Sequence, residues 1–166
     1  MIKSVLAMVL LCVAPLAAHA AAPQPAKPVA LSDYSGRWYE IARMPNRLQR
    51  GCVSGTVDYA IRDNRLHAVQ RCITNENRRA RTFRSSGRIL DPGVNAKARL
   101  TFSGFWSQDY WVIDHSHDWA LIGDPSGKYL WVMSRAPRLS APAAAQAIGR
   151  VRALGYDASK LEFTAA

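Results

Sequence analysis

A succession of short segments that alternate apolar and polar residues most constrains the fold of this chain. In residues 97–102, Ala98, Leu100 and Phe102 fall on one face of an extended backbone, and the polar side chains fall on the other. Comparable segments follow one another through residue 135, separated by turns and with no helical period between them. This pattern predicts an all-β fold, either an up-and-down antiparallel barrel or a sandwich.

The alternation and the turn residues place the expected strands. They cover residues 38–43, 53–62, 66–73, 82–89, 97–102, 110–114, 119–123 and 128–135. The sequence does not determine which face of residues 66–73 points inward. Leu66 and Ala68 lie on one face of this segment, and Val69 and Ile73 lie on the other. A basic loop over residues 46–51 is long enough to lie over an opening, and residues 103–109 are expected to form a second loop.

A helix is expected only after the last of these strands. Ser140 is a suitable N-cap, Pro142 fits the first turn, and Gly155 is a C-terminal stop. Apolar residues recur at a spacing of three and four, so that one face docks on the β-structure: Ala147, Ile148, Val151 and Leu154. Residues 160–163 are expected to add a last short strand.

The N-terminal residues have the pattern of an export signal. Lys3, an apolar run and the small-x-small site at residues 18–20 predict a signal peptide over residues 1–20. Cys12 lies inside the apolar run after a leucine, so no lipidation is expected there. Residues 21–31, rich in Pro and Ala, are expected to form an extended, mobile leader before a single domain at 32–166. We therefore expect a periplasmic protein, with the outer membrane as a second location.

The chain is strongly basic. Without the signal it retains 21 Lys and Arg against 12 Asp and Glu, a balance of +9. Such a surface suits an anionic membrane, but it is also compatible with a soluble basic protein. The arginines are scattered over the strands rather than clustered on a helix, so no nucleic-acid partner is predicted.

Cys52 and Cys72 remain after the signal and flank a predicted hairpin. An even pair in an exported protein predicts a structural disulfide. Gly36 provides a tight entry to the strand that contains Trp38. The large side chain of Trp38 suits a plug at one end of a small barrel, and its indole N–H needs an acceptor.

Three segments together resemble the lipocalin family, in its bacterial and apolipoprotein-D-like branch. They are Gly36-Arg37-Trp38-Tyr39-Glu40-Ile41-Ala42-Arg43, Tyr110-Trp111-Val112-Ile113-Asp114 and Tyr129-Leu130-Trp131-Val132-Met133-Ser134-Arg135. The resemblance implies an eight-stranded calyx with the C-terminal helix packed outside it. It also implies that Arg135 packs on Trp38 at the closed end. Many bacterial members carry a lipid anchor, whose motif this chain lacks.

The residues expected inside the barrel are mostly aromatic or aliphatic: Val57, Tyr59, Phe83, Leu100, Phe102, Tyr110, Val112, Trp131 and Met133. They suit an acyl chain, although the same alternation describes a barrel filled by its own side chains. Among the loop arginines, Arg47 and Arg50 are candidate contacts for a carboxylate or phosphate, as are Arg78 and Arg79. The alternative is that these arginines are only solvated and have no role in binding a head group.

The functional expectation is therefore a carrier of a fatty acid or lysophospholipid, as a monomer or weak homodimer. No cofactor or metal is expected, because His115 and His117 lie in a polar turn with few further ligands. The sequence contains no Gly-x-Ser-x-Gly motif and no paired-carboxylate or Cys–His signature, so no enzyme is expected. The alternatives are a filled barrel that acts through its basic face and a calyx enzyme with an apolar substrate.

Overall fold

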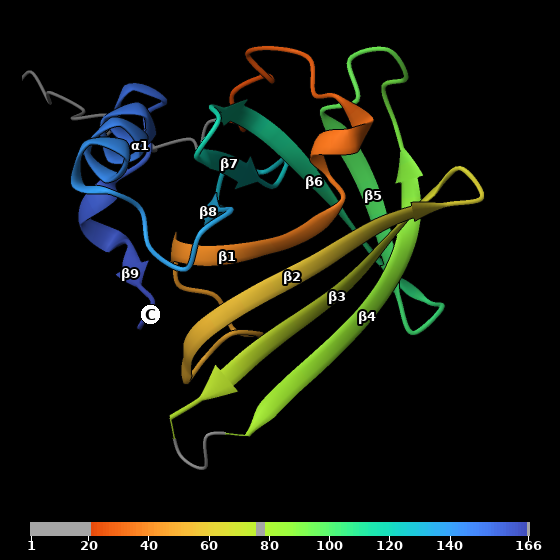
Figure 1. The fold of residues 1–166 in the computed structure, drawn as a ribbon, viewed down its shortest axis with the longest axis horizontal. Helices are drawn as coiled ribbons and strands as arrows, with labels where there is room; N and C mark the ends of the chain where they lie inside the picture. The colour runs from red at the N-terminus through yellow and green to blue at the C-terminus, as the bar shows by residue number, and fades with distance from the viewer. Residues whose placement is uncertain (1–20, 76–78, 166) are drawn as a thin grey trace, which may run out of the picture.

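The computed structural model describes residues 21–75 and 79–165, and the predicted signal peptide lies outside this part. The chain forms a closed antiparallel barrel, with α1 packed on its outside (Figure 1). Its strands are β1 (Gly36–Arg43), β2 (Cys52–Arg62), β3 (Arg65–Thr74), β4 (Ala80–Ile89), β5 (Lys97–Phe102), β6 (Trp106–His115), β7 (Trp119–Gly123) and β8 (Leu130–Ser134). The predicted barrel and its outer helix are confirmed.

β1 closes the barrel by pairing with both β2 and β8. Its first half, Gly36–Tyr39, pairs with β2, and a bulge follows between Glu40 and Ala42. Beyond the bulge β2 diverges from β1, and the short strand β9 (Glu162–Phe163) pairs with Ala42 and Arg43 instead (Figure 1). The barrel is therefore open at the C-terminal end of β1 and closed at the N-terminal end of β1, where Trp38 lies.

One close approach requires a glycine. A Cβ on Gly87 would lie 1.7 Å from the Arg99 carbonyl oxygen. The pairing of β4 with β5 therefore depends on the absence of a side chain at this position.

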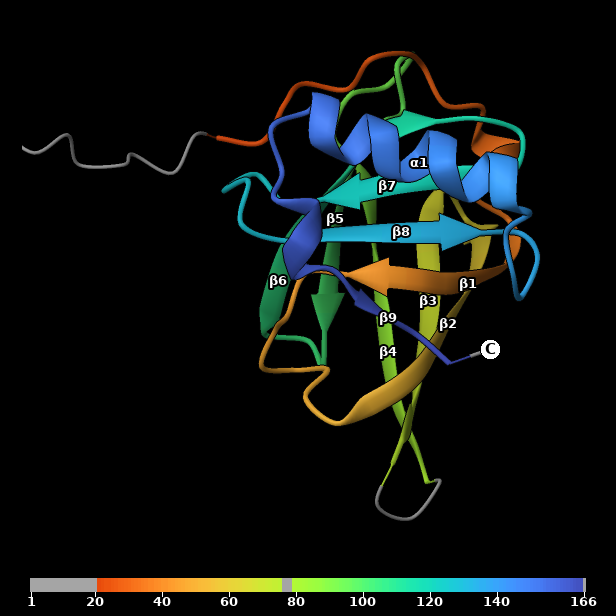
Figure 2. The ribbon, with the colours of Figure 1, turned by 90° about the vertical axis from the view of Figure 1, so that its left-hand side faces the viewer.

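The helix α1 (Ala141–Ala153) lies across the outside of the barrel beside β7 (Figure 2). The Ser140 hydroxyl accepts a hydrogen bond from the Ala143 amide at 3.4 Å, as expected for an N-cap. Ala143, Ala147 and Val151 are buried against an outer apolar cluster that includes Ile113 and Leu121, and Ile148 and Leu154 pack at its edge. No helix in the described part of the chain has the length and apolarity needed to cross a membrane.

The N-terminal segment differs from its expectation, because it is docked rather than mobile. Its backbone amides donate to carbonyls of one strand and two turns of the barrel: Ala26 to Ile113 of β6 at 2.8 Å, Ala22 to Pro125 at 3.1 Å and Val29 to Val94 at 2.9 Å. Ala22 and Val29 are also buried. These hydrogen bonds fix a segment whose composition alone is typical of a linker.

Other element boundaries also differ from the expectation. β6 begins at Trp106, because Trp106 pairs with Phe102, so the loop is shorter than residues 103–109. The expected strand at 160–163 is a 3₁₀ turn over Ala158–Lys160 followed by β9. In β3, Leu66, Ala68 and Cys72 are buried and Val69 is half-exposed, which settles the inward face of that strand.

Candidate ligand-binding cavity

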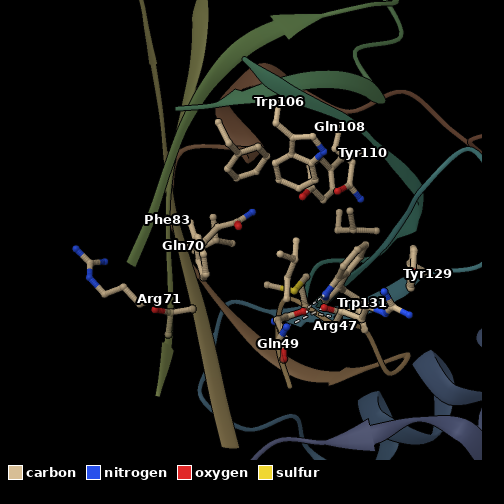
Figure 3. Close-up of a pocket in the computed structure, with 18 of the residues that line it drawn as sticks. Arg47, Gln49, Gln70, Arg71, Phe83, Trp106, Gln108, Tyr110, Tyr129 and Trp131 are labelled. Carbon is tan, nitrogen blue, oxygen red and sulfur yellow. Dashed lines mark hydrogen bonds between the residues drawn. The ribbon is translucent and has the colours of Figure 1, made fainter. Parts of the chain in front are cut away.

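The open half of the barrel contains a cavity of about 520 Å³, called the outer cavity below. Strands from around the barrel line it together with residues of the loop between β1 and β2 (Figure 3). Aromatic side chains dominate its wall: Tyr59, Phe83, Phe102, Phe105, Trp106, Tyr110, Tyr129 and Trp131. The barrel is therefore hollow at this end.

All nine residues predicted to face inward belong to the apolar cluster of the barrel interior. Seven of them line the outer cavity: Val57, Tyr59, Phe83, Phe102, Tyr110, Trp131 and Met133. Val112 lines a separate cavity toward the closed end, and the buried Leu100 lines neither. Contact of these residues with a ligand stays a prediction.

The wall also carries polar side chains that the alternation did not single out. Gln70 and Gln108 line the outer cavity, and Gln49 reaches it from the loop between β1 and β2 (Figure 3). The Gln49 Oε1 accepts from the Trp131 indole at 2.7 Å, and its Nε2 donates to Glu40 Oε2 at 2.5 Å. Glu40 is paired with Arg43 Nη1 at 2.5 Å. The loop between β1 and β2, residues 44–51, is called the mouth loop below. This chain of contacts fixes the mouth loop to the strands beneath it.

The four loop arginines occupy different positions. Arg47 is exposed and lines the outer cavity, whereas Arg50 is exposed but does not line it. Arg79 is exposed beside the turn after β3, and Arg78 lies outside the described residues. Arg71, which was not predicted, lines the cavity but turns its guanidinium away from it (Figure 3) and pairs with Asp58. Among the predicted loop arginines that the structure describes, Arg47 is the one that lines the outer cavity, and its contact with an anionic group stays a prediction.

Burial shapes the acid–base state of the tyrosines in the interior. Desolvation raises the pKa of Tyr110 to about 12 and raises the pKa of Tyr59 still further. A tyrosine hydroxyl with its ordinary pKa of about 10 is already neutral at physiological pH, and burial of Tyr59 and Tyr110 reinforces this, so neither adds charge to the cavity.

The closed end has the contact that the resemblance implied. The Arg135 guanidinium lies 4.0 Å from the centre of the Trp38 ring. It also donates to the backbone carbonyls of Asp33 at 2.5 Å and Ser35 at 3.0 Å. The Trp38 indole donates to the Tyr34 carbonyl at 3.3 Å. Burial lowers the pKa of Arg135, and the Asp33 carboxylate opposes that change.

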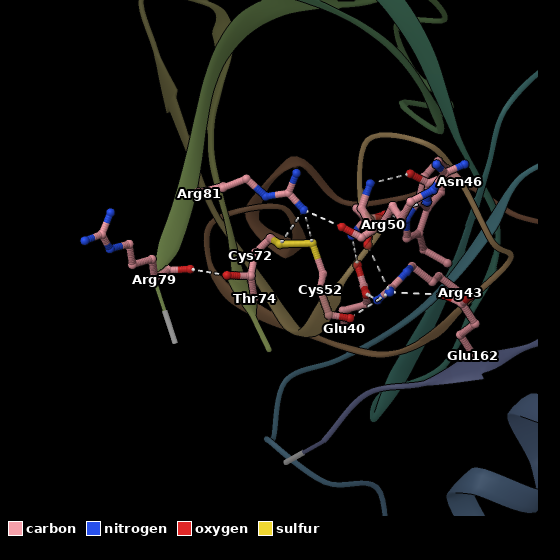
Figure 4. Close-up of a disulfide and its surroundings, with 12 residues drawn as sticks. Glu40, Arg43, Asn46, Arg50, Cys52, Cys72, Thr74, Arg79, Arg81 and Glu162 are labelled. Atoms are coloured by element: carbon pink, nitrogen blue, oxygen red, sulfur yellow. Dashed lines mark hydrogen bonds and ion pairs between the residues drawn. A yellow bond between two sulfur atoms is a disulfide. The ribbon is translucent and has the colours of Figure 1, made fainter. Parts of the chain in front are cut away.

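The predicted disulfide between Cys52 and Cys72 is present and links β2 to β3 near the mouth (Figure 4). The two Cα atoms are 5.5 Å apart. Arg81 on β4 extends over the sulfurs and donates to the Arg50 carbonyl at 2.7 Å. The disulfide and Arg81 thus connect the mouth loop to β3 and β4.

The histidines lie in the turn between β6 and β7, at the closed end. His115 Nε2 is 3.1 Å from the Pro28 carbonyl oxygen, and His117 is exposed. Within residues 21–75 and 79–165, no group of three or more His, Cys, Asp or Glu side chains is arranged to hold a metal ion.

Comparison with known proteins shows the family. A family model described as a lipocalin-like domain matches residues 29–166. Temperature-induced lipocalin-1 of Arabidopsis thaliana is 34% identical over 143 residues, which cover 79% of this chain and 76% of that protein. The chain belongs to the lipocalin family, whose members generally bind small hydrophobic molecules in the calyx.

Bacterial and structural relatives agree with this assignment. Outer membrane lipoprotein Blc of Escherichia coli (strain K12) is 32% identical over 132 residues, which cover 76% of this chain and 73% of that protein. Insecticyanin from the tobacco hornworm Manduca sexta has the same fold, with a TM-score of 0.71 and 18% identity over 87% of this chain and 84% of its own.

Proposed function

We propose that this protein binds and carries one single-chain lipid, a fatty acid or a lysophospholipid, in the bacterial cell envelope. The observation that carries the proposal is the outer cavity of about 520 Å³, which has an aromatic wall and an arginine at its edge. An acyl chain fits the apolar wall, and a carboxylate or phosphate fits Arg47.

The energetics of such a cavity favour a long chain. Each buried methylene contributes about 0.8 kcal/mol, so a long acyl chain reaches micromolar affinity without a specific polar contact. Selection among head groups then falls to the few polar side chains near the mouth. Arg47 supplies the charge there, and Gln49, Gln70 and Gln108 supply hydrogen-bonding groups.

The mouth also supports contact with an anionic membrane surface. Three large apolar side chains at the rim of the outer cavity are exposed: Phe105 at 88%, Leu48 at 51% and Trp106 at 40%. Arg47 and Arg50 flank Leu48 on the same loop, and the chain carries a basic excess. Relatives named as outer membrane lipoproteins support a place in the envelope. We propose a monomer or weak homodimer there.

The two rival functions have less support. A filled barrel is disfavoured by the outer cavity. A calyx enzyme would draw on Tyr110, Asp114 or the histidines, but these groups are not brought together. Asp114 is held on the outside of the barrel by Arg150 at 2.6 Å and Lys27 at 3.3 Å. His115 and His117 line a separate cavity at the closed end, and Tyr110 lines the outer cavity. We therefore propose a carrier and not an enzyme.

Tryptophan fluorescence tests the proposal, because Trp106 and Trp131 line the outer cavity. Delipidated protein should show a saturable change at micromolar fatty acid or lysophospholipid. Arg47→Gln should weaken binding of the anionic ligand about fivefold, as expected for loss of a rim contact of about 1 kcal/mol. Arg50→Gln is the matched control from the same loop and should change little. A flat titration with both lipids would contradict the proposal.

A further inference from the structure

Four arginines, called the arginine row below, lie side by side across the outer face of the barrel. They belong to β2, β3, β4 and β5, which are neighbours on the side of the barrel away from α1 (Figure 1). Arg62 is paired with Arg65 in the hairpin of β2 and β3, and Arg88 is paired with Arg99 between β4 and β5. The register of β3 and β4, extended by one position beyond its last pair, places Arg65 beside Arg88.

The charge of the arginine row is largely uncompensated. All four arginines are exposed, because the residues beside them in each strand face the barrel interior. Arg99 is paired with Asp109 at 2.6 Å. The other three form no ion pair with any carboxylate in residues 21–75 and 79–165, including Asp63 in the adjoining turn. The row therefore presents positive charge to solvent.

Such a row is unfavourable in the free protein. Like charges directly opposite each other on neighbouring strands destabilise a sheet, and neighbouring strands are only about 4.8 Å apart. Anions placed over the row would remove this repulsion. They would also gain charge-assisted hydrogen bonds, because a guanidinium group can bind two oxygens of one phosphate. The arginine row therefore fits a partner that presents several phosphate groups close together.

The shape and the surroundings of the row favour a lipid surface over a nucleic acid. The row crosses the convex outer wall of the barrel, which a flat surface can touch (Figure 1). The outward positions next to it carry His67, Ser86 and Thr101. None of these is Phe, Tyr or Trp, so this face offers no broad aromatic platform on which bases could stack. Lipid head groups move within a leaflet and can gather beneath closely spaced charges.

We propose that the arginine row docks this protein on an anionic lipid surface, with lipid phosphates held between neighbouring guanidinium groups. The contact needs no ligand in the outer cavity and therefore goes beyond the proposed carrier function. It is also separate from the apolar rim at the mouth. Arg62 and Arg65 flank the turn between β2 and β3, whereas the mouth disulfide lies near the opposite ends of these strands.

Co-sedimentation of the delipidated protein with vesicles tests the proposal. Vesicles of phosphatidylcholine with about one-third phosphatidylglycerol should bind the wild type at about 0.1 M salt and release it at about 1 M, where screening is strong. Vesicles of phosphatidylcholine alone should not bind it. Since each arginine near an anionic leaflet strengthens binding about fivefold, Arg65→Gln/Arg88→Gln should bind the anionic vesicles about 25-fold more weakly.

The matched control is Arg138→Gln/Arg152→Gln, which removes the same charge from exposed positions just before and within α1. It should bind nearly as the wild type does. Equal losses in the two double variants would show a general effect of net charge and would overturn the proposal. Binding of the wild type to soluble polyphosphate but not to the anionic vesicles would overturn it as well.

Two further measurements separate the arginine row from the mouth and from misfolding. Loss of vesicle binding in Arg47→Gln/Arg50→Gln, with unchanged binding in Arg65→Gln/Arg88→Gln, would place the contact at the mouth and overturn the proposal. In urea denaturation, Arg65→Gln/Arg88→Gln should be at least as stable as the wild type, because repulsion between opposed arginines is removed. A clear loss of stability would contradict the proposal. Fatty-acid binding by this variant should be unchanged, so the carrier function is tested independently.

Discussion

Glu40 and Arg43 form an ion pair in the barrel wall with side chains only 5% and 4% exposed. Arg43 Nη2 also donates to the Cys52 carbonyl at 2.9 Å and meets Glu162 at 3.1 Å, while Glu40 accepts from Gln49. Desolvation makes such a pair costly to form, and the loss of one partner leaves the other as a buried charge. At the residue scale, this pair holds together β1, β9 and the mouth loop (Figure 4).

We predict that Arg43→Met lowers the free energy of unfolding by about 3–5 kcal/mol, because Glu40 would be left buried without its cation. Urea denaturation measures the loss. The double variant Glu40→Gln/Arg43→Met should recover part of it, since no buried charge remains. A double variant less stable than Arg43→Met would contradict this account of the pair.

Arg135 should act on stability and not on ligand choice, because it lies at the closed end against Trp38. We predict that Arg135→Ala costs about 1–2 kcal/mol in the free energy of unfolding, the range for a partly desolvated cation–π contact. The relative affinities for fatty acid and lysophospholipid should stay unchanged in the same variant. A change in that preference with unaltered stability would show that Arg135 has a different role.

At the scale of elements, two links hold peripheral parts to the barrel. The Cys52–Cys72 disulfide joins β2 to β3 at the mouth. At the other side, Asp114 of β6 pairs with Arg150 of α1 and with Lys27 of the N-terminal segment. One carboxylate therefore ties the helix and the docked segment to the same strand.

The disulfide closes a loop with a sequence separation of 20 residues. In the chain-entropy model, a loop of this length corresponds to about 3 kcal/mol of stabilisation. We predict a loss of that size for Cys52→Ala/Cys72→Ala in chemical denaturation, with the barrel still folded. Addition of a reductant should destabilise the wild type and leave the double variant unaffected. An equal response of both proteins to the reductant would contradict the prediction.

Asp114 should make stability depend on acid pH. Burial raises its pKa, but hydrogen bonds from Arg150, the His115 amide and Lys27 outweigh that effect, and the folded-state pKa is lowered. A lowered folded pKa contributes stability above the unfolded value of about 3.9, and this contribution is lost as pH falls through the folded pKa. Asp114→Asn should therefore be less stable than the wild type at neutral pH, with the gap closing below about pH 4. Thermal unfolding across pH measures the gap; a constant gap would contradict the assignment.

At the scale of the whole molecule, period-two alternation predicts an all-β fold and its inward set, and the resemblance of three segments to the lipocalin family is what selects a barrel over a sandwich. The nine inward residues follow from side chains pointing to alternate faces of a strand. β3 was ambiguous because both of its faces carry apolar residues, and its pairing with β2 and β4 settles the register. The docking of the N-terminal segment depends on backbone hydrogen bonds, which composition does not encode.

The hollow interior itself was beyond prediction from the sequence. A filled barrel and an empty one share the same alternation, and the difference lies in how side chains from distant strands meet. The polar contacts of Gln49 with Trp131 and Glu40 also join residues far apart in the sequence. Single glutamines in loops and strands give no signal of such a network.

The central claim is that the barrel holds one acyl chain in its outer cavity, and native mass spectrometry of delipidated protein with a lysophospholipid tests it most directly. We predict one bound lipid per chain. Phe83→Arg, which places a charge in the cavity wall, should abolish the complex, while Thr82→Arg, at the exposed neighbour on the same strand, should retain it. No complex in the wild type, or equal binding by both variants, would contradict the account.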